Sequence, residues 1–283
     1  MSYLVLALAS AFLYGLWKFG LGIYRGRISV FGILLVNASA AGVVYLVAGF
    51  AEGNLAFDSN DIMWGLAGGF LNCAGTLFIL KAFERGKMGV VAGVAATSVL
   101  VPLAYSLMIG EDPTARGAIG VVVILAGLAA FYVPHMHTTV TATGTKPRQA
   151  ILLALAAALF WGLAIVVIDD GSRVSVTGTL AVSQVPQVLV ALAVLVATAP
   201  RSFAGLTRRP VAILVGAGLA LGLANIAFFT AAQQGDIGLV SVLGSLSPMV
   251  TALLALAVLK ERMARSDVVA LVIVLAGVAL IVS

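Results

Sequence analysis

The chain has 283 residues, of which 62% are hydrophobic and only 10% charged. A soluble domain of this size carries about 25% charged residues because its surface must be solvated, so this composition excludes an ordinary water-soluble protein. The formal net charge of +5 does not indicate nucleic-acid binding, because the basic residues lie in short loops between apolar blocks. The single cysteine, Cys73, excludes an internal disulfide and any multi-cysteine metal site.

The apolar blocks have the length of roughly 18–24 residues that a helix needs to cross a hydrocarbon core about 30 Å thick. Backbone polar groups in lipid must pair internally, which predicts helices. We expect ten spans, approximately at residues 3–23, 29–51, 62–83, 88–109, 115–134, 150–168, 177–199, 210–232, 237–259 and 267–282. The first span is interpreted as a retained helix because no basic residue precedes it and no small-residue cleavage site follows it.

The longest polar stretch, residues 135–149, divides these spans five and five. Its Thr, Gly and Pro content predicts a cytoplasmic linker between a first repeat at 1–134 and a second repeat at 150–283. Of the 16 Lys and Arg residues, 13 lie on the linker's side of the predicted membrane. Because Lys and Arg are enriched in cytoplasmic loops, we expect both termini on the non-cytoplasmic side of the cell (inner) membrane.

The two halves of the sequence resemble each other. Tyr14-Gly15-Leu16 matches Trp161-Gly162-Leu163 at a displacement of 147 residues, and the same displacement takes Asn37 to Gln184. An odd number of spans in each copy places the two copies in opposite orientations. The predicted fold class is therefore an all-α integral membrane protein with ten transmembrane helices arranged as two inverted five-helix repeats. Transporters built in this way bind their substrate between the repeats, near the middle of the bilayer.

Several motifs resemble a known family. The second half contains Gln234-Gly235-Asp236-Ile237-Gly238, then Pro248, a Lys-Glu-Arg turn at 260–262 and a glycine-containing last helix; the first half contains Leu-Lys-Ala-Phe-Glu-Arg-Gly at 80–86. This pattern resembles the EamA-like branch of the drug/metabolite transporter (DMT) superfamily over essentially the whole chain. The resemblance implies a secondary carrier or exporter of small polar or amphipathic metabolites and names no substrate.

Lys18 is the one charged residue well inside a predicted span. A charge at membrane depth is costly and by default marks a substrate or ion path. Lys18 would neutralise a carboxylate or phosphate, or exchange a proton. The alternative is that its long side chain extends to the inner interface, toward the loop that holds Arg25.

The other candidate substrate-binding residues are polar or aromatic side chains inside spans. Asn37 and Gln184 would bond either a ligand or a neighbouring helix, and Gln187 lies on nearly the same helix face as Gln184. The remaining candidates are Tyr14, Trp17, Asn72, Trp161, Asn225 and Ser245. Helix–helix bonding and interfacial aromatic belts are the structural alternatives for these residues.

Three further residues predict a gate. Pro248 would interrupt the ninth helix, whereas the corresponding position in the fourth helix carries Ser98, with Pro102 four residues later. Proline removes a backbone donor, so flexible breaks at these positions would allow the helices to move. The alternative is that proline is simply common in membrane helices.

Tyr105, near the end of the fourth predicted span, is interpreted as an interfacial aromatic residue. Asp169 and Asp170 are interpreted as an exposed acidic face that attracts cations or pairs with Arg173. No glutamate lies deep in a span, which argues against proton exchange through a buried glutamate. We expect no enzymatic activity, cofactor or metal, because the sequence has no GxxxxGK[ST] run and no Gly-x-Ser-x-Gly elbow.

The leading hypothesis is a secondary transporter that moves a small polar or amphipathic metabolite by alternating access, an anionic or zwitterionic one such as an amino acid or organic acid. The expected partners are this substrate and the lipid bilayer, and no nucleic acid. Proton coupling and simple facilitation are both open, as are a monomer and a homodimer. One alternative is an exporter of organic cations or drugs held by aromatic rings. An alternative of a different class is a non-transporting lipid-handling or structural membrane protein.

Overall fold

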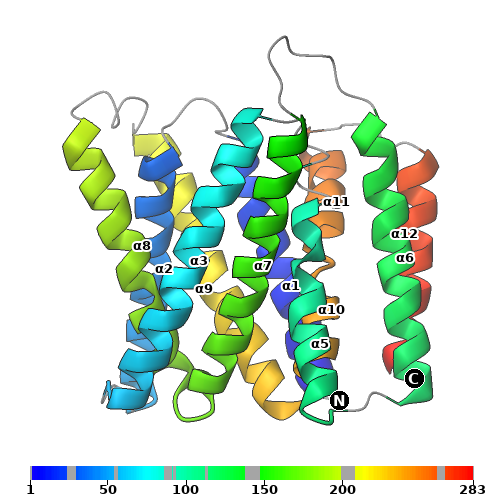
Figure 1. Ribbon diagram of the computed structural model, residues 1–283, viewed down its shortest axis with the longest axis horizontal. Coiled ribbons are helices and arrows are strands. Elements are labelled where there is room, and N and C mark those ends of the chain that lie inside the picture. The colour runs from blue at the N-terminus through cyan, green and yellow to red at the C-terminus, as the bar shows by residue number, and fades with distance from the viewer. Residues whose placement is uncertain are drawn as a thin grey trace.

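The computed structural model describes residues 2–23, 30–53, 57–85, 91, 94–111, 114–137, 147–198, 208–259 and 265–282, and within them every regular element is a helix (Figure 1). In chain order these are α1 (Ser2–Ile23), α2 (Val30–Ala51), α3 (Ser59–Arg85), the 3-10 helix η1 (Ala96–Val99), α5 (Leu100–Met108), α6 (Ala115–His137), α7 (Pro147–Ser172), α8 (Val176–Thr198), α9 (Arg208–Gln234), α10 (Ile237–Gly244), α11 (Ser247–Leu259) and α12 (Arg265–Val282). The all-helical class predicted from the sequence is confirmed for this part of the chain. Helix extends into both ends of the predicted linker at 135–149, and residues 138–146 of that linker lie outside the described residues.

Six of the described helices are long and apolar enough to cross a bilayer, namely α1, α2, α3, α7, α8 and α9. Four shorter apolar segments accompany them, at Ala96–Met108, Ala115–Ala130, Ile237–Thr251 and Val268–Ile281. The outer faces of the bundle carry large apolar side chains, such as Phe50 at 79% exposure and Val196 at 80%. Such faces are solvated by hydrocarbon rather than by water, so the chain is an integral membrane protein.

Each helix contact described here has a counterpart in which every helix is replaced by the corresponding helix of the other half. α1 packs on α9 as α7 packs on α3, and α2 packs on α9 as α8 packs on α3. α1 also packs on α10 and α11, as α7 packs on η1 and α5, while α2 pairs with α8 and α6 with α12. The N-terminus and the C-terminus lie at the same end of the bundle (Figure 1). The ten-helix inverted repeat itself stays a prediction.

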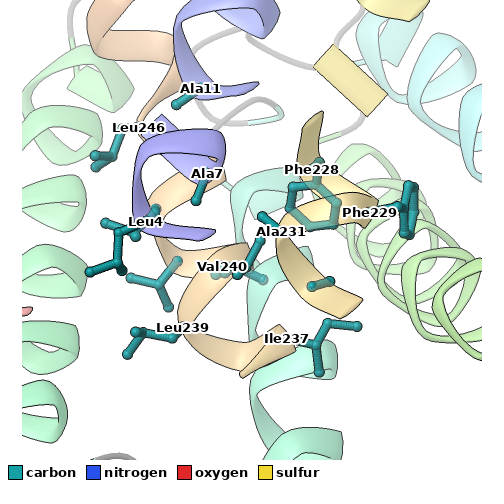
Figure 2. Packing of buried hydrophobic residues seen from close by; sticks show 14 of the residues in the cluster. Leu4, Ala7, Ala11, Phe228, Phe229, Ala231, Ile237, Leu239, Val240 and Leu246 are labelled. Carbon is teal, nitrogen blue, oxygen red and sulfur yellow. The ribbon is translucent and has the colours of Figure 1, made fainter. Parts of the chain in front are cut away.

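Small residues bring the paired helices close together. A Cβ atom on Gly15 would lie 2.5 Å from Cβ of Val250, and a Cβ atom on Gly162 would lie 2.5 Å from Cβ of Val101. Lipid tails are as apolar as the helices, so membrane helices associate through this close van der Waals packing. Figure 2 shows the same principle between α1, α9 and α10, where Ala7 of α1 lies beside larger apolar side chains of the core.

Two of the helical segments are interrupted. Between α10 and α11 the chain turns at residues 245–246, where the amide of Leu246 donates to the carbonyl of Leu243 at 3.1 Å. Pro248 has no N–H, so the carbonyl of Gly244 lacks its helical donor at this point. In the first half, η1 ends three residues before Pro102, and the carbonyl of Ser98, which that proline cannot bond, accepts a backbone amide at the end of η1 instead.

Candidate functional site

Three side chains on one face of α1 each contact a different helix. Tyr14, Trp17 and Lys18 are spaced i, i+3 and i+4, so they project from the same side of the helix. All three are half-buried. Their polar atoms bond to α9, α2 and α11 respectively, which makes this face of α1 the centre of a polar network inside an apolar bundle.

The ammonium group of Lys18 donates a hydrogen bond to the hydroxyl of Ser247, with 2.7 Å between Nζ and Oγ. Ser247 is the first residue of α11 and lies near the middle of the apolar segment that α10 and α11 form. The ammonium is therefore bonded to the first residue after the interruption between α10 and α11. No carboxylate of the described residues pairs with Lys18. An ammonium has three donors, so this one retains hydrogen-bonding capacity for a ligand.

The indole of Trp17 is held by an amide of α2. Its Nε1 donates to Oδ1 of Asn37 at 3.0 Å, and Nδ2 of Asn37 donates to the carbonyl of Ile33 at 3.0 Å. Asn37 is only 4% exposed. Both ends of this side chain amide are thus paired within the protein, and Asn37 serves to orient Trp17.

A second polar chain links α1, α9 and α2. Tyr14 donates its hydroxyl hydrogen to Oδ1 of Asn225, and Nδ2 of Asn225 donates to the hydroxyl oxygen of Tyr45 at 2.6 Å. The ring of Tyr14 also makes an edge contact with Phe228 at 6.3 Å between centroids. Tyr45 is fully buried and the sequence analysis missed it. The only feature of the sequence that could have indicated Tyr45 is its type, an aromatic residue with a hydroxyl, deep inside an apolar span.

The two glutamines of α8 form a separate pair. Nε2 of Gln187 donates to Oε1 of Gln184 at 3.3 Å, and Nε2 of Gln184 donates to the hydroxyl of Ser183 at the same distance. Gln184 is 6% exposed and Gln187 is 7% exposed. α8 packs on α2, where a Cβ atom on Gly42 would lie 3.9 Å from the Gln184 side chain. This pair is part of the interface between the two halves.

The remaining predicted residues occupy other places. Trp161 of α7 packs against α3, where a Cβ atom on Gly75 would lie 2.6 Å from the indole ring. Asn72 also belongs to α3, and its backbone carbonyl accepts a hydrogen bond from the hydroxyl of Thr76. The hydroxyl of Ser245 is half-buried and donates to the carbonyl of Val242 at 2.6 Å, within the turn between α10 and α11.

The three predicted gate residues lie at the interruptions. Ser98 belongs to η1 and Pro102 is buried in α5. Pro248 is the second residue of α11, and its side chain lies outside the described residues. A Cβ atom on Gly162 would lie 2.8 Å from the carbonyl oxygen of Ser98, so this break is packed against α7. Whether these residues open a gate stays a prediction.

A cavity of about 520 Å³ lies at the end of the bundle where α5, α7 and α9 terminate. Its lining comprises Tyr105, Ile109, Glu111, Asp169, Asp170, Arg173, Ala232, Gln233 and Gly235. None of the candidate substrate-binding residues predicted from the sequence lines this cavity. It therefore constitutes a second polar feature, apart from the network on α1.

The surroundings of Asp169 and Asp170 differ from the exposed acidic face that the sequence predicted for them. Asp169 is only 5% exposed, because the end of α9 covers it. Gln233 of α9 donates from Nε2 to Oδ1 of Asp169 at 2.8 Å. Asp170 forms the predicted ion pair with Arg173 at 2.9 Å and also accepts from the hydroxyl of Tyr105 at 3.0 Å. The interpretation of Asp169 as exposed is wrong, since sequence alone does not show which helix end packs over it.

Glu111 is brought to the cavity by the end of α5. Gly110 has a φ of +83°, its amide donates to the carbonyl of Leu107, and the amide of Glu111 donates to the carbonyl of Ser106. This Schellman motif reverses the chain and is favoured by glycine. Oε2 of Glu111 then accepts from the amide of Ile237 at 3.1 Å, at the first residue of α10. Burial raises the pKa of the Glu111 carboxyl above its ordinary value, and the nearby charge of Asp236 raises it further, against the lowering effect of the bond from the Ile237 amide.

A second bond joins the same helices. The hydroxyl of Ser106 donates to Oδ1 of Asp236 at 2.6 Å, and this carboxylate also caps α10 by accepting from the amide of Leu239 at 3.0 Å. Asp is a preferred N-cap residue because its side chain satisfies an amide that has no helical partner. Together with Tyr105–Asp170 and Glu111–Ile237, this bond fastens the end of α5 to the second half of the chain.

Comparison with known proteins now identifies the family. Residues 148–283 match the model of the EamA-like transporter family. The second half of the chain belongs to this family. For these residues, the match confirms the resemblance to the EamA-like branch of the DMT superfamily.

A solved structure shares the fold of the whole chain. One solved crystal structure, described only as that of a protein, superposes with a TM-score of 0.84 over 99% of this chain and 96% of the other. The two sequences are 17% identical, so this similarity establishes the fold alone. No curated protein sequence matches the chain. The substrate must therefore be inferred from the side chains of the chain itself.

Proposed function

We propose that this protein is a secondary transporter that carries a small metabolite with a carboxylate or another anionic group, as an anion or a zwitterion, across the inner membrane. The observation that carries the proposal is the ammonium of Lys18. It lies in the middle of an apolar bundle with a neutral hydroxyl, Ser247, as its bonded partner. Charged side chains at such depth are costly and are found where they line a substrate or ion path. An anionic substrate would supply the missing counter-charge.

The aromatic residues beside Lys18 support the same site. Trp17 and Tyr14 lie within one turn of the ammonium, with ring centroids 6.4 Å apart and an edge-on arrangement. Their polar atoms are already fixed by Asn37 and Asn225, so the rings are held in place without a ligand. Such preorganisation lowers the entropy cost of binding. We infer that Lys18 binds the charged group while the two rings contact the rest of the metabolite.

The transport mechanism that we propose is alternating access between two inverted five-helix repeats. The exchange of packing partners between the halves supports this arrangement, as does the equal placement of Gly15 and Gly162 against the interrupted segments. Ser247 lies directly after the break between α10 and α11, so a ligand on Lys18 would act on the movable part of the bundle. The bonds from the end of α5 to the second half would keep the cavity end closed.

The orientation that we propose places both termini outside the cytoplasm. It is supported by the excess of Lys and Arg at the other end of the bundle. The cavity lined by Asp169 would then face the outside. Thiol labelling of single cysteines introduced near the two ends, in intact cells, tests this orientation. Labelling of the cavity end only in permeabilised cells would reverse it.

The experiment that tests the site compares wild-type protein with Lys18→Ala and a matched control, Lys81→Ala. Lys81 carries the same charge but is exposed at the end of α3. Thermal unfolding of each protein is measured against amino acids, organic acids, sugar phosphates, nucleosides and quaternary amines, because a ligand that binds only the folded state raises its stability. We expect an anionic or zwitterionic compound to stabilise wild type and Lys81→Ala, but not Lys18→Ala. Stabilisation of all three proteins by organic cations alone would favour the cation exporter.

Transport itself is measured with the compound so identified. Proteoliposomes loaded with unlabelled compound should accumulate the labelled compound by exchange, and those with Lys18→Ala should not. Binding without exchange would instead indicate the non-transporting class. The same vesicles, with and without a proton gradient, distinguish proton coupling from simple facilitation.

A further inference from the structure

Gly15 of α1 and Gly162 of α7 make equivalent contacts with the two interrupted segments. A Cβ atom on Gly15 would lie 2.5 Å from a valine side chain and 3.1 Å from the carbonyl oxygen of Ser247. A Cβ atom on Gly162 would lie 2.5 Å from a valine side chain and 2.8 Å from the carbonyl oxygen of Ser98. The two serines therefore correspond to each other, and so do the positions counted from the two glycines along α1 and α7.

Three residues after each glycine, the two helices carry side chains of opposite character. In α1 this residue is Lys18, whose ammonium donates to the hydroxyl of Ser247 at 2.7 Å. In α7 it is Ile165, which is half-buried and packs against the same apolar core as Tyr14. Residues three apart share a helix face, so Ile165 lies on the face of α7 that meets Ser98. Of these two corresponding positions, only the one on α1 carries a charge.

The residue before each glycine is aromatic in both helices. It is Tyr14 in α1 and Trp161 in α7, and both rings are half-buried. Trp161 is four residues before Ile165, so these two side chains also share a face of their helix. The face of α1 therefore combines an aromatic ring with a cation, whereas the face of α7 combines an aromatic ring with an aliphatic side chain.

The two faces lie toward opposite ends of the bundle. α1 begins at the cavity end, where Tyr3 lies against the cavity residue Gly235, and it runs toward the linker end. α7 runs the other way, from Pro147 to the cavity residues Asp169 and Asp170. A ligand whose anionic group is bound to Lys18 therefore extends along the bundle axis, with its other end toward α7 and the cavity.

This arrangement has opposite consequences for a charged and an apolar end of the ligand. A second charge near Ile165 would lose its hydration without gaining a counter-charge, which is costly. An apolar end in the same place would be removed from water, which is favourable in proportion to the area that is buried. The position of Ile165 therefore discriminates between ligands by the end that Lys18 does not bind.

We propose that the site selects compounds with one charged end, anionic or zwitterionic, and an apolar or aromatic opposite end, and that Ile165 is the residue that excludes a second charge. The inference rests on the proposed function, in which Lys18 binds the anionic group. It adds the substrate class, an amphipathic compound rather than a dicarboxylate, and it adds the orientation, with the charged end toward the linker.

Hexanoate and adipate are the matched probes, because they share one carbon chain and differ only in a terminal methyl or a second carboxylate. 4-Phenylbutyrate adds an aromatic ring at the far end. Binding to purified protein in detergent is measured by calorimetry and by thermal unfolding. The variants are Lys18→Ala, Ile165→Ala and Ile165→Lys, with Leu163→Ala as the control. Leu163 belongs to the same helix but is 37% exposed, among the side chains that face lipid.

We expect wild type to bind hexanoate and 4-phenylbutyrate, and to bind adipate at least about tenfold more weakly. Ile165→Ala should weaken the binding of 4-phenylbutyrate about threefold or more, because it removes apolar contact area, and Leu163→Ala should not. Ile165→Lys places a second ammonium beside Ser98 and should bind adipate at least about tenfold more tightly than wild type. Should Ile165→Lys fail to fold, the comparison of the two alanine variants and of the two probes still decides.

The inference is overturned if adipate binds wild type as tightly as hexanoate, or if Ile165→Ala and Leu163→Ala weaken binding equally. Adipate binding that is no tighter in folded Ile165→Lys, or no binding of either monocarboxylate by wild type, would overturn it as well. The proposed function fails by a different result, namely Lys18→Ala binding the monocarboxylates as tightly as wild type. Binding that needs Lys18 but accepts adipate equally would leave the proposed function standing and remove this inference alone.

Discussion

The close contacts of Gly15 and Gly162 allow a quantitative test of the packing between the halves. A Cβ atom at either position would lie 2.5 Å from a valine Cβ, whereas carbon atoms in contact prefer about 3.5–4.0 Å. Gly15→Ala or Gly162→Ala must therefore push the neighbouring helix away by about 1 Å. Overpacking of this kind costs about 1–3 kcal/mol. At about 2–4 °C for each kcal/mol in a large domain, each variant should unfold at a temperature about 2–10 °C below that of wild type.

The assay is thermal unfolding in detergent, followed by tryptophan fluorescence. Gly216→Ala is the matched control, because Gly216 lies in α9 with nothing within 4 Å of its would-be Cβ atom. We expect this control to unfold at or slightly above the wild-type temperature, since alanine favours helix. The reasoning is refuted if Gly15→Ala and Gly162→Ala both unfold within about 1 °C of the control. A large effect at only one of the two positions would argue against equivalent packing in the two halves.

Two further predictions concern single polar groups. Tyr45→Phe removes the acceptor of Asn225 Nδ2 and should lower the free energy of unfolding by about 0.6–2 kcal/mol. The free energy is measured in mixed micelles with increasing denaturant. An unchanged value would show that this hydrogen bond does not contribute to stability. Glu111→Gln should raise the unfolding temperature at about pH 8 but not at about pH 4. The folded state binds the Glu111 proton more tightly than the unfolded state, so stability falls as pH rises from the ordinary pKa of 4.5 through the raised one. The glutamine keeps an acceptor for the amide of Ile237. A variant less stable than wild type at both pH values would contradict this assignment.

Much of the fold follows from composition and from a few residues. The apolar blocks predicted the membrane helices because backbone groups in lipid have no other partner than their own helix. Pro248 marked the break between α10 and α11 because proline lacks a backbone donor. The motifs of the second half predicted the EamA-like family, and the family match confirmed them. All these features depend on neighbouring residues or on short motifs, so they can be read locally.

The partners of the polar side chains could not be predicted in this way. Lys18 was recognised from its position in a span, but its partner Ser247 is 229 residues away. Tyr45 was missed because nothing in its own helix distinguishes a buried tyrosine from an interfacial one. Asp169 was placed on an exposed face because its neighbours in sequence are polar, whereas the end of α9 covers it.

The sequence by itself therefore determined that this chain spans a membrane as helices, where the helix before Pro248 breaks and which family its second half resembles. Only the tertiary structure decided which polar groups meet. It placed the ammonium of Lys18 beside the break before α11, and it buried Asp169 against Gln233 at the end of α9. The physical reason is that hydrogen bonding within a helix depends on residues four apart, whereas contacts between helices depend on rotation, tilt and depth, which the packing of the whole bundle sets.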